Sequence, residues 1–298
     1  GFCLWNTRTT DWNSVVRGPR RDVVREFVEA CRRHGMRIGL YWSWVDWHYP
    51  EWAKRFVWTD LAQWRKPFDD AAEHRKLVDF LHAQVRELLT DYGPVDILWF
   101  DGGFLTAEEY RSREMVDMVR QLQPDILIND RSGLYEERDF GCPEGQIPTE
   151  APTRPWELCH CTQSAWGYEG DEEGLYYPAQ DLLALLCDSV ALGGNVLLTV
   201  GPMGDGRFSR HSQGQLAVLG AWLRIHGEAV FGTTPGPFGR RSWGVSTRKG
   251  NTVYLILFRP TSPMRIHGLN NRVKRARLVD GAVDIAFSQR GGLLEFEV

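Results

Sequence analysis

The sequence has no apolar run long enough to cross a membrane. Its apolar runs, such as Val95–Phe100, have the length of single strands, whereas a membrane span needs about 20 residues. It also has no excess of charge, since 35 Lys and Arg face 39 Asp and Glu for a net charge of −4. This balance argues against nucleic acid or an anionic membrane surface as a partner. The sequence leaves oligomeric state and compartment open, and an oligomer is compatible with it.

The usual motifs for metals and cofactors are missing as well. No H-x-H or H-E-x-x-H pattern occurs, and the six cysteines have no repeated spacing. Cys159 and Cys161 would share one face of a strand, but a zinc site needs two further ligands. We expect buried thiols there, no metal and no cofactor. The segment 201–206 follows a strand but lacks the G-K-[ST] ending of a phosphate loop, so it is interpreted as a tight turn.

The sequence does contain a regular alternation of short apolar runs and amphipathic stretches. Because the apolar runs are continuous, they indicate buried strands of a parallel sheet. Helices are expected over 20–34, 73–92, 106–122, 179–192 and 213–226, and strands over 36–43, 95–101, 125–130, 156–161 and 195–200, with a strand remnant over 1–5. Thr106 and Glu109 have the spacing of a capping box at the start of the third helix.

The predicted fold class is α/β, specifically a (β/α)8 TIM-like barrel that lacks its first strands. Six strands are expected, whereas a closed barrel of this type has eight. A doubly wound open sheet is the alternative, but no G-x-G-x-x-G follows a first strand. Beyond 233–238 the helical period disappears, and Asp280-Gly281 and Gly291-Gly292 indicate turns between short strands. We therefore predict a barrel domain over 1–235 and a small antiparallel β domain over 236–298.

Reactive side chains in such a barrel come from the carboxyl ends of strands and the loops that follow. This rule selects Asp101, Asp130-Arg131 and the segment from Tyr41 to His48. Asp101 is the sharpest candidate, because Gly102-Gly103 would leave its carboxylate uncrowded, although a helix-capping role is an equal alternative. The 13 tryptophans suit either stacking on sugars or filling a core.

Glycoside hydrolysis needs a second carboxyl group besides Asp101, to protonate the leaving oxygen. The segment 132–155 offers Glu136, Glu137, Glu144 and Glu150. Glu144 stands between Pro143 and Gly145, in a stiff turn that could hold it over a pocket. From the residues alone, each of these glutamates is better explained as a surface charge than as a catalyst.

An ordered set of short blocks resembles one family. GFCLWNTRTTDWNSV, GLYWSWVDWHYPEW, VDILWFDGG, INDR, DFGCPE, PWELC, SAWGY and GGNVLLTVGPMGDG are similar to blocks of the retaining α-L-fucosidases of glycoside hydrolase family 29. The resemblance extends from residue 1 to about 236. It implies an exo-acting hydrolase that releases α-L-fucose from fucosylated oligosaccharides or glycoconjugates by double displacement. A catalytically impaired sugar-binding homologue and a hydrolase of a related sugar, such as an α-L-galactoside, are the alternatives.

The resemblance also implies roles for individual residues. Asp101 matches the nucleophile, and Glu144, 43 residues downstream, matches the general acid/base. Trp99, Arg131 and Tyr41 match pocket residues, and Trp166 matches an aromatic that packs against the apolar methyl group of fucose.

One departure from the family pattern concerns the beginning of the chain. The family carries a His pair just before the Asp-Gly-Phe block, and this chain starts at the Gly of that block. The hypothesis follows that the chain is a truncated gene product or partial sequence without two barrel strands, and both an active and an inactive chain are compatible with it.

Overall fold

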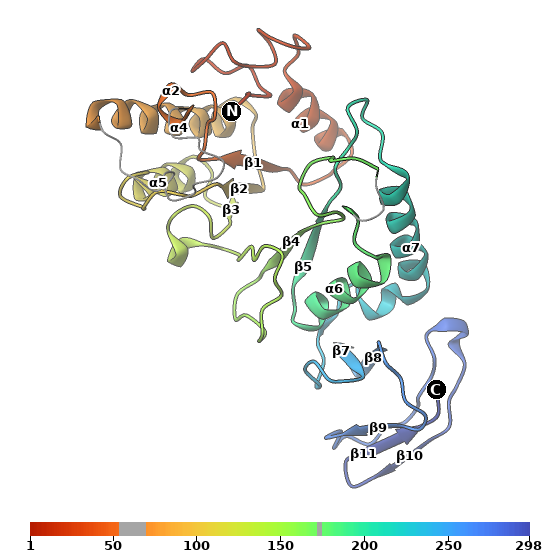
Figure 1. Cartoon of the computed structure of the whole chain (residues 1–298). Helices are drawn as coiled ribbons and strands as arrows, with labels where there is room; N and C mark the ends of the chain where they lie inside the picture. The colour runs from red at the N-terminus through yellow and green to blue at the C-terminus, as the bar shows by residue number, and fades with distance from the viewer. Residues whose placement is uncertain (54–69, 172–174) are drawn as a thin grey trace. The chain divides into compact units, whose positions relative to one another are not determined.

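A computed structural model describes residues 1–53, 70–171 and 175–298. The chain forms two compact units, Gly1–Gly141 and Cys142–Val298, and each is described by itself below. Figure 1 shows the elements of both units along the chain. Both contain parallel strands and helices, and the second also contains antiparallel sheets. The fold is therefore mixed α/β, as predicted.

The first unit is built on a parallel sheet with the strand order β1-β2-β3. Its strands are β1 (Gly39–Ser43), β2 (Ile97–Asp101) and β3 (Leu127–Ile128), and its helices are α1 (Val23–Arg33), α2 (Pro50–Ala53), α4 (Ala71–Asp91), α5 (Ser112–Leu122) and the 3-10 turn η1 (Tyr135–Glu137). The predicted alternation of helix and parallel strand is confirmed here. Local signals set the helix starts: the carboxylates of Asp22 and Asp70 accept backbone N–H bonds in the first turns of α1 and α4.

The side chains of β1 and β2 alternate between the core and the opposite face of the sheet. Leu40, Leu98 and Phe100 are buried, and they join the buried side of α4 in one hydrophobic cluster. Burying each such side chain contributes about 1.5–3 kcal/mol. The intervening residues, which include Tyr41, Trp99 and Asp101, face the other way and are half-buried or exposed. The expectation of strands buried on both faces is therefore wrong for β1 and β2.

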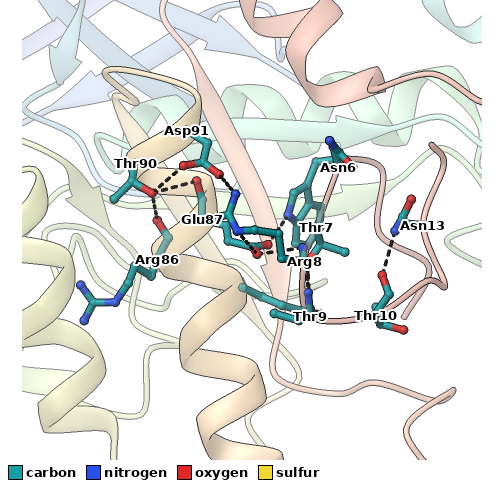
Figure 2. A network of polar contacts seen from close by, with 12 residues as sticks. Asn6, Thr7, Arg8, Thr9, Thr10, Asn13, Arg86, Glu87, Thr90 and Asp91 are labelled. Atoms are coloured by element: carbon teal, nitrogen blue, oxygen red, sulfur yellow. Dashed lines mark hydrogen bonds and ion pairs between the residues drawn. The ribbon is translucent and has the colours of Figure 1, made fainter. Parts of the chain in front are cut away.

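The predicted strand remnant over 1–5 is also wrong, although backbone bonds do hold these residues, since the Cys3 N–H donates to the Trp12 oxygen at 3.1 Å and the Val24 N–H donates to the Leu4 oxygen at 3.0 Å. Cys3 forms only an isolated bridge to Asn13. The indole N–H of Trp5 donates to Oε2 of the buried Glu87 on α4 at 3.0 Å, and the backbone N–H of Arg8 donates to Oε1 at 2.9 Å. Figure 2 shows this network, in which Arg8 also reaches Asp91. A carboxylate of α4 thus adds to the backbone bonds that hold the beginning of the chain.

The capping box forms as predicted, but α5 begins later than expected. The backbone N–H of Thr106 donates to Oε2 of Glu109 at 2.8 Å, and the N–H of Glu109 donates to Oγ1 of Thr106 at 3.3 Å. This pair closes a turn instead of starting a continuous helix. Arg111 has a left-handed φ of 49°, which separates that turn from the helix beginning at Ser112.

The second unit starts with a parallel pair of strands and their helices. β4 (Glu157–Cys161) pairs with β5 (Asn195–Thr199), and α6 (Ala179–Ala191), α7 (Arg210–His226) and the 3-10 turn η3 (Gly227–Ala229) lie along the same stretch. These bounds agree with the predicted elements within a few residues. All six cysteines of the chain are buried, as expected. None of the helices in the described residues has the length and apolar character that a membrane span requires.

Antiparallel strands follow, in two small sheets. β6 (Thr234–Pro235), β7 (Gly244–Lys249) and β8 (Thr252–Leu257) form the first, and β9 (Met264–His267), β10 (Phe287–Arg290) and β11 (Leu293–Phe296) form the second, with the turn η4 (Asp280–Ala282) between β9 and β10. A separate cluster of buried side chains supports the second sheet, consisting of Phe238, Met264, Ile266, Leu294 and Phe296. The boundary at 235/236 stays a prediction, and this cluster lies wholly on its C-terminal side.

Both predicted turns in this region connect antiparallel segments. Gly291 and Gly292 have φ values of 54° and 83° between β10 and β11, where side chains are disfavoured. Asp280-Gly281 lies in a longer turn, because the antiparallel bridge is between Arg277 and Asp284. It is therefore not the two-residue hairpin turn that the sequence suggests.

A buried carboxylate on α6 predicts a pH-dependent stability. Asp188 is 6% exposed and pairs with the largely exposed Arg240 at 3.0 Å, and burial raises the pKa of Asp188. A carboxyl group with a raised folded-state pKa favours the folded state while protonated and loses that contribution as pH rises through the raised value. The substitution Asp188→Asn should therefore stabilise the protein at pH 7 by about 1 kcal/mol, the scale of a desolvation penalty. Urea unfolding at pH 4 and pH 7 measures this, with a smaller gap expected at pH 4. A variant less stable than the parent at pH 7 would show that the Arg240 pair outweighs the cost of burial.

Candidate active site

Asp101 ends β2 on the face of the sheet that points away from the core. Its side chain is 32% exposed and both of its carboxylate oxygens are bonded. The hydroxyl of Tyr41 donates to Oδ2 at 2.6 Å, and Nη1 of Arg131 donates to Oδ1 at 2.7 Å. These bonds fix the carboxylate plane and still leave each oxygen a further lone pair.

Trp99 forms the base of this cluster. Its ring stacks with that of Tyr41 at a centroid distance of 5.7 Å and an interplanar angle of 23°. The guanidinium of Arg131 lies 4.7 Å from the centroid of the same ring, within the range of a cation–π contact. The structure therefore brings together Tyr41, Trp99, Asp101 and Arg131, all of which were selected from the sequence.

The sheet register explains why these residues meet. In the parallel pair of β1 and β2, Tyr41 lies opposite Trp99 and Ser43 lies opposite Asp101. Alternation then puts Tyr41, Trp99 and Asp101 on one face. Burial of the Tyr41 hydroxyl, followed by its bond to Asp101, raises the pKa of that phenol. Tyr41 consequently stays protonated near neutral pH and acts as a donor to the carboxylate.

The chain turns sharply just behind Asp101, and glycine is required there. Gly102 has a φ of 71°, and a Cβ atom at this position would come within 3.0 Å of both the Ser43 hydroxyl and a Val45 methyl group. The buried Trp44 donates its indole N–H to the backbone oxygen of Arg131 at 3.0 Å. The loop that carries Arg131 is thereby attached to the core.

Other residues from the selected Tyr41–His48 segment have structural places. Trp42 and Trp44 are buried in the core of the first unit. The buried Asp46 accepts the backbone N–H groups of His48 and Tyr49 at 2.9 and 3.2 Å, so it fixes the turn before α2. Of this segment, only Tyr41 makes a side-chain bond to Asp101 in the described contacts.

Glu144 belongs to the second unit, beside β4. Its neighbours hold the backbone in place, since the Gly145 N–H donates to the Cys159 oxygen at 3.0 Å and the Cys159 N–H donates to the Pro143 oxygen at 2.9 Å. The side chain of Glu144 is exposed. Its charge contributes, after burial and Cys159, to raising the pKa of Cys161 to about 11. Glu144 itself forms an isolated parallel bridge with Cys159, and the predicted turn is reduced to a bend at Gly145, which has a φ of 66°.

Trp166 lies in the loop that follows β4 and is 44% exposed. The buried Gln163 at the end of β4 donates its side-chain amide to the Gly167 oxygen, and Ser164 donates to Glu169 at 3.1 Å. These bonds hold both ends of the loop in place. An exposed indole on a fixed loop is suited to contact an apolar part of a ligand.

The remaining glutamates have other surroundings. Glu137 pairs with Arg113 at 2.8 Å in the first unit, and Glu136 and Glu150 are exposed. Within the described parts of the chain, no three His, Cys, Asp or Glu side chains gather as a metal site would require.

A groove of about 780 Å³ runs along α4 and α5 in the first unit, away from these residues. Part of its charged lining is paired, because Arg8 meets Glu87 while Arg111 meets Asp79 and Glu114. None of the predicted site residues lines it. The groove is therefore not treated as the active site.

A carboxylate fixed at the carboxyl end of a parallel strand has the position typical of reactive groups in α/β enzymes, and it could serve as one of the two carboxyl groups that a glycoside hydrolase needs. Comparison with known proteins agrees with that class. The family model described as alpha-L-fucosidase matches residues 1–228. The chain belongs to the alpha-L-fucosidase family.

The individual relatives share 28–31% of the aligned residues with this chain, and they are longer than it. The alpha-L-fucosidase of Dictyostelium discoideum is 28% identical over 87% of this chain and 57% of its own length, and the tissue enzyme of Bos taurus is 30% identical over 86% and 55%. The chain thus spans a little over half the length of these curated relatives. Among solved structures, the alpha-L-fucosidase isoenzyme 1 of Paenibacillus thiaminolyticus covers all of this chain and 76% of its own, with a TM-score of 0.83 and 31% identity. The Thermotoga maritima alpha-fucosidase, solved with a mechanism-based inhibitor, covers all of this chain and 69% of its own, with a TM-score of 0.80 and 30% identity.

Proposed function

We propose that the chain is the catalytic part of an exo-acting, retaining α-L-fucosidase. The observation that carries the proposal is the Asp101 carboxylate, held by Tyr41 and Arg131 beside Trp99 in a member of this family. The proposed architecture is that of a (β/α)8 barrel, followed by the small β domain over 236–298. The proposed substrates are fucosylated oligosaccharides or glycoconjugates.

The solved relatives support this chemistry in what they bind. The Thermotoga maritima protein was captured with a mechanism-based inhibitor, as a covalent catalyst would be. A fucosynthase form of that protein was solved with α-L-Fuc-(1-2)-β-L-Fuc-N3. We propose that this chain also has a nucleophile that attacks the anomeric carbon of fucose directly.

In the proposed first step, the Asp101 carboxylate attacks the anomeric carbon of the fucoside. The glycosidic C–O bond breaks as Glu144 gives its proton to the leaving oxygen, which departs as an alcohol. The product is a fucosyl ester on Asp101 with inverted configuration. Tyr41 and Arg131 keep the attacking carboxylate in one orientation, which lowers the entropic cost of reaching the transition state.

In the second step, the Glu144 carboxylate removes a proton from water, and the resulting oxygen attacks the same carbon. The ester bond to Asp101 breaks, the carboxylate is regenerated and fucose leaves with its original configuration. Trp99 offers a flat aromatic surface beside the sugar, and Trp166 is proposed to contact its methyl group. The protein supplies the whole mechanism through side chains, with no step assigned to a metal or cofactor.

The test is a panel of 4-nitrophenyl glycosides, with the released sugar followed by NMR. The full chain should release fucose from the α-L-fucoside as the α anomer and be slower on the α-L-galactoside, whose additional hydroxyl replaces a hydrogen of the methyl group. Fucose binding without turnover would identify a sugar-binding homologue instead. A preference for the galactoside, or fucose released as the β anomer, would contradict the substrate or the retaining mechanism respectively.

A further inference from the structure

The sheet is incomplete on one side of Asp101. β3 pairs with β2 through Leu127 opposite Ile97 and Ile128 opposite Leu98, and the ladder then stops. β2 continues for three more residues to Asp101. On its other side, β1 remains paired with it as far as Asp101. The last part of β2 therefore lacks backbone partners from β3.

The side chain of Asn129 supplies the missing partners. The backbone N–H of Phe100 donates to Oδ1 of Asn129 at 3.0 Å, and Nδ2 of Asn129 donates to the backbone oxygen of Phe100 at 2.9 Å. Asn129 and Phe100 are both completely buried. The backbone of Asn129 meanwhile turns away and bridges Phe140. One amide group thus replaces one rung of the ladder.

The position of that rung matters because the Phe100 oxygen belongs to the peptide group that joins Phe100 to Asp101. Fixing this group fixes the direction in which the Asp101 side chain leaves the backbone. The backbone oxygen of Gly102, the residue after Asp101, accepts a hydrogen bond from the Tyr110 hydroxyl at 3.3 Å. Backbone groups on both sides of the carboxylate are therefore held by buried side chains, and Asn129 makes the two shorter bonds.

We propose that Asn129 is a positioning residue, which keeps Asp101 aligned with the anomeric carbon by closing both hydrogen bonds of Phe100. The role rests on the proposed function, since it assumes that Asp101 attacks the sugar. Without Asn129, two buried backbone groups lose their partners, and the end of β2 shifts to find others. A displacement of about 1 Å at an attacking group is enough to slow a reaction by about 100-fold.

The experiment measures how fast Asp101 reacts, separately from how much protein is folded. The full chain is incubated with 2-fluoro-fucosyl fluoride, and intact mass follows the covalent adduct to completion. We expect Asn129→Ala to reach full labelling of its folded fraction with a maximum rate constant about 10- to 100-fold lower, and an almost unchanged half-saturating concentration. Asn129→Ser, which keeps a hydroxyl in the same space, should lose less. Hydrogen exchange of the peptide 96–102 should be faster in both variants.

Asn13 offers a matched control in the same unit. It is also a buried asparagine, and its side chain bonds to the backbone of Thr10, Val15 and Val16 at 2.8 to 3.0 Å. Asn13→Ala should lower the melting temperature to a similar degree and leave the labelling rate constant within about twofold, because it does not touch β2.

The outcomes separate the two proposals. If the parent chain is not labelled, the proposed function is wrong and the positioning role falls with it. If the parent is labelled and both Asn129 variants react at its rate, only the positioning role is wrong. An equal loss in Asn13→Ala would also overturn that role, because it would show a general effect of destabilisation.

Discussion

Replacing Asp101 with glycine is expected to reduce hydrolysis of 4-nitrophenyl α-L-fucoside by about 10⁴-fold or more, because no other group can form the covalent ester. Tyr41 and Arg131 would remain around the vacated space, since both bond to the lost carboxylate. Added azide should enter that space, attack the anomeric carbon and displace nitrophenolate. The product is then the β-fucosyl azide, of inverted configuration, and its formation is measured by NMR.

Asp96 provides the control for this experiment at the opposite end of the same strand. Its carboxylate accepts the Ile38 N–H at 2.7 Å and pairs with Arg37 at 3.0 Å. Asp96→Ala removes an equally well-bonded acid from the sheet, and we expect turnover within about threefold of the parent and no response to azide. Substantial activity in Asp101→Gly without azide would mean that a different residue is the nucleophile.

Replacing Glu144 with alanine should give a loss that depends on the leaving group. An oligosaccharide leaves as a poor alkoxide and needs the proton, so its release should fall by about 10²- to 10⁴-fold. The acidic phenol of an activated aryl fucoside leaves without a proton donor, so the formation of the fucosyl ester from such substrates should be almost unaffected. The second step then becomes slow, and azide should accelerate it by attacking the fucosyl ester. The expected product is the α-fucosyl azide, the opposite anomer from that of Asp101→Gly.

Glu150 is the matched control, because it is exposed and lies in the same acidic segment. Glu150→Ala should hydrolyse aryl fucosides and fucosyl oligosaccharides alike at the parent rate. If instead Glu150→Ala shows the leaving-group dependence and yields α-fucosyl azide, the acid/base assignment moves from Glu144 to Glu150.

The part of the site on the first unit could be predicted because it follows from local rules. Apolar runs locate β1 and β2, and a parallel register makes their carboxyl ends level. Residues two apart then share a face, so Trp99 and Asp101 had to point the same way. The sequence predicts that the glycine after Asp101 leaves its carboxylate uncrowded, whereas the structural reason for glycine is a left-handed φ with close neighbours on two sides.

The features that could not be predicted depend on contacts between distant parts of the sequence. β3 has two residues instead of the expected six, because Asn129 uses its side chain where a backbone rung was expected. Nothing in the run INDR distinguishes an asparagine that bonds to a strand from one that caps a turn. Similarly, the first residues pair with Glu87, about 80 positions away, instead of forming a strand.

Glu144 illustrates a third case. Its proline and glycine neighbours predict a turn, but the bend that forms is fixed by backbone bonds to Cys159, on a strand that starts after an irregular segment. Only the family resemblance selected this glutamate among the four candidates. Its role therefore depends on the kinetic comparison with Glu150.

The tight turn at Gly102 limits how this chain can be redesigned. Any larger residue immediately after Asp101 would need an unfavourable φ and would press on Ser43 and Val45. In mutant libraries intended to broaden the range of accepted sugars, most substitutions at position 102 would strain the turn. Trp166, which exposes 44% of its surface, is the better place to randomise, because the Tyr41 hydroxyl is needed to hold the Asp101 carboxylate.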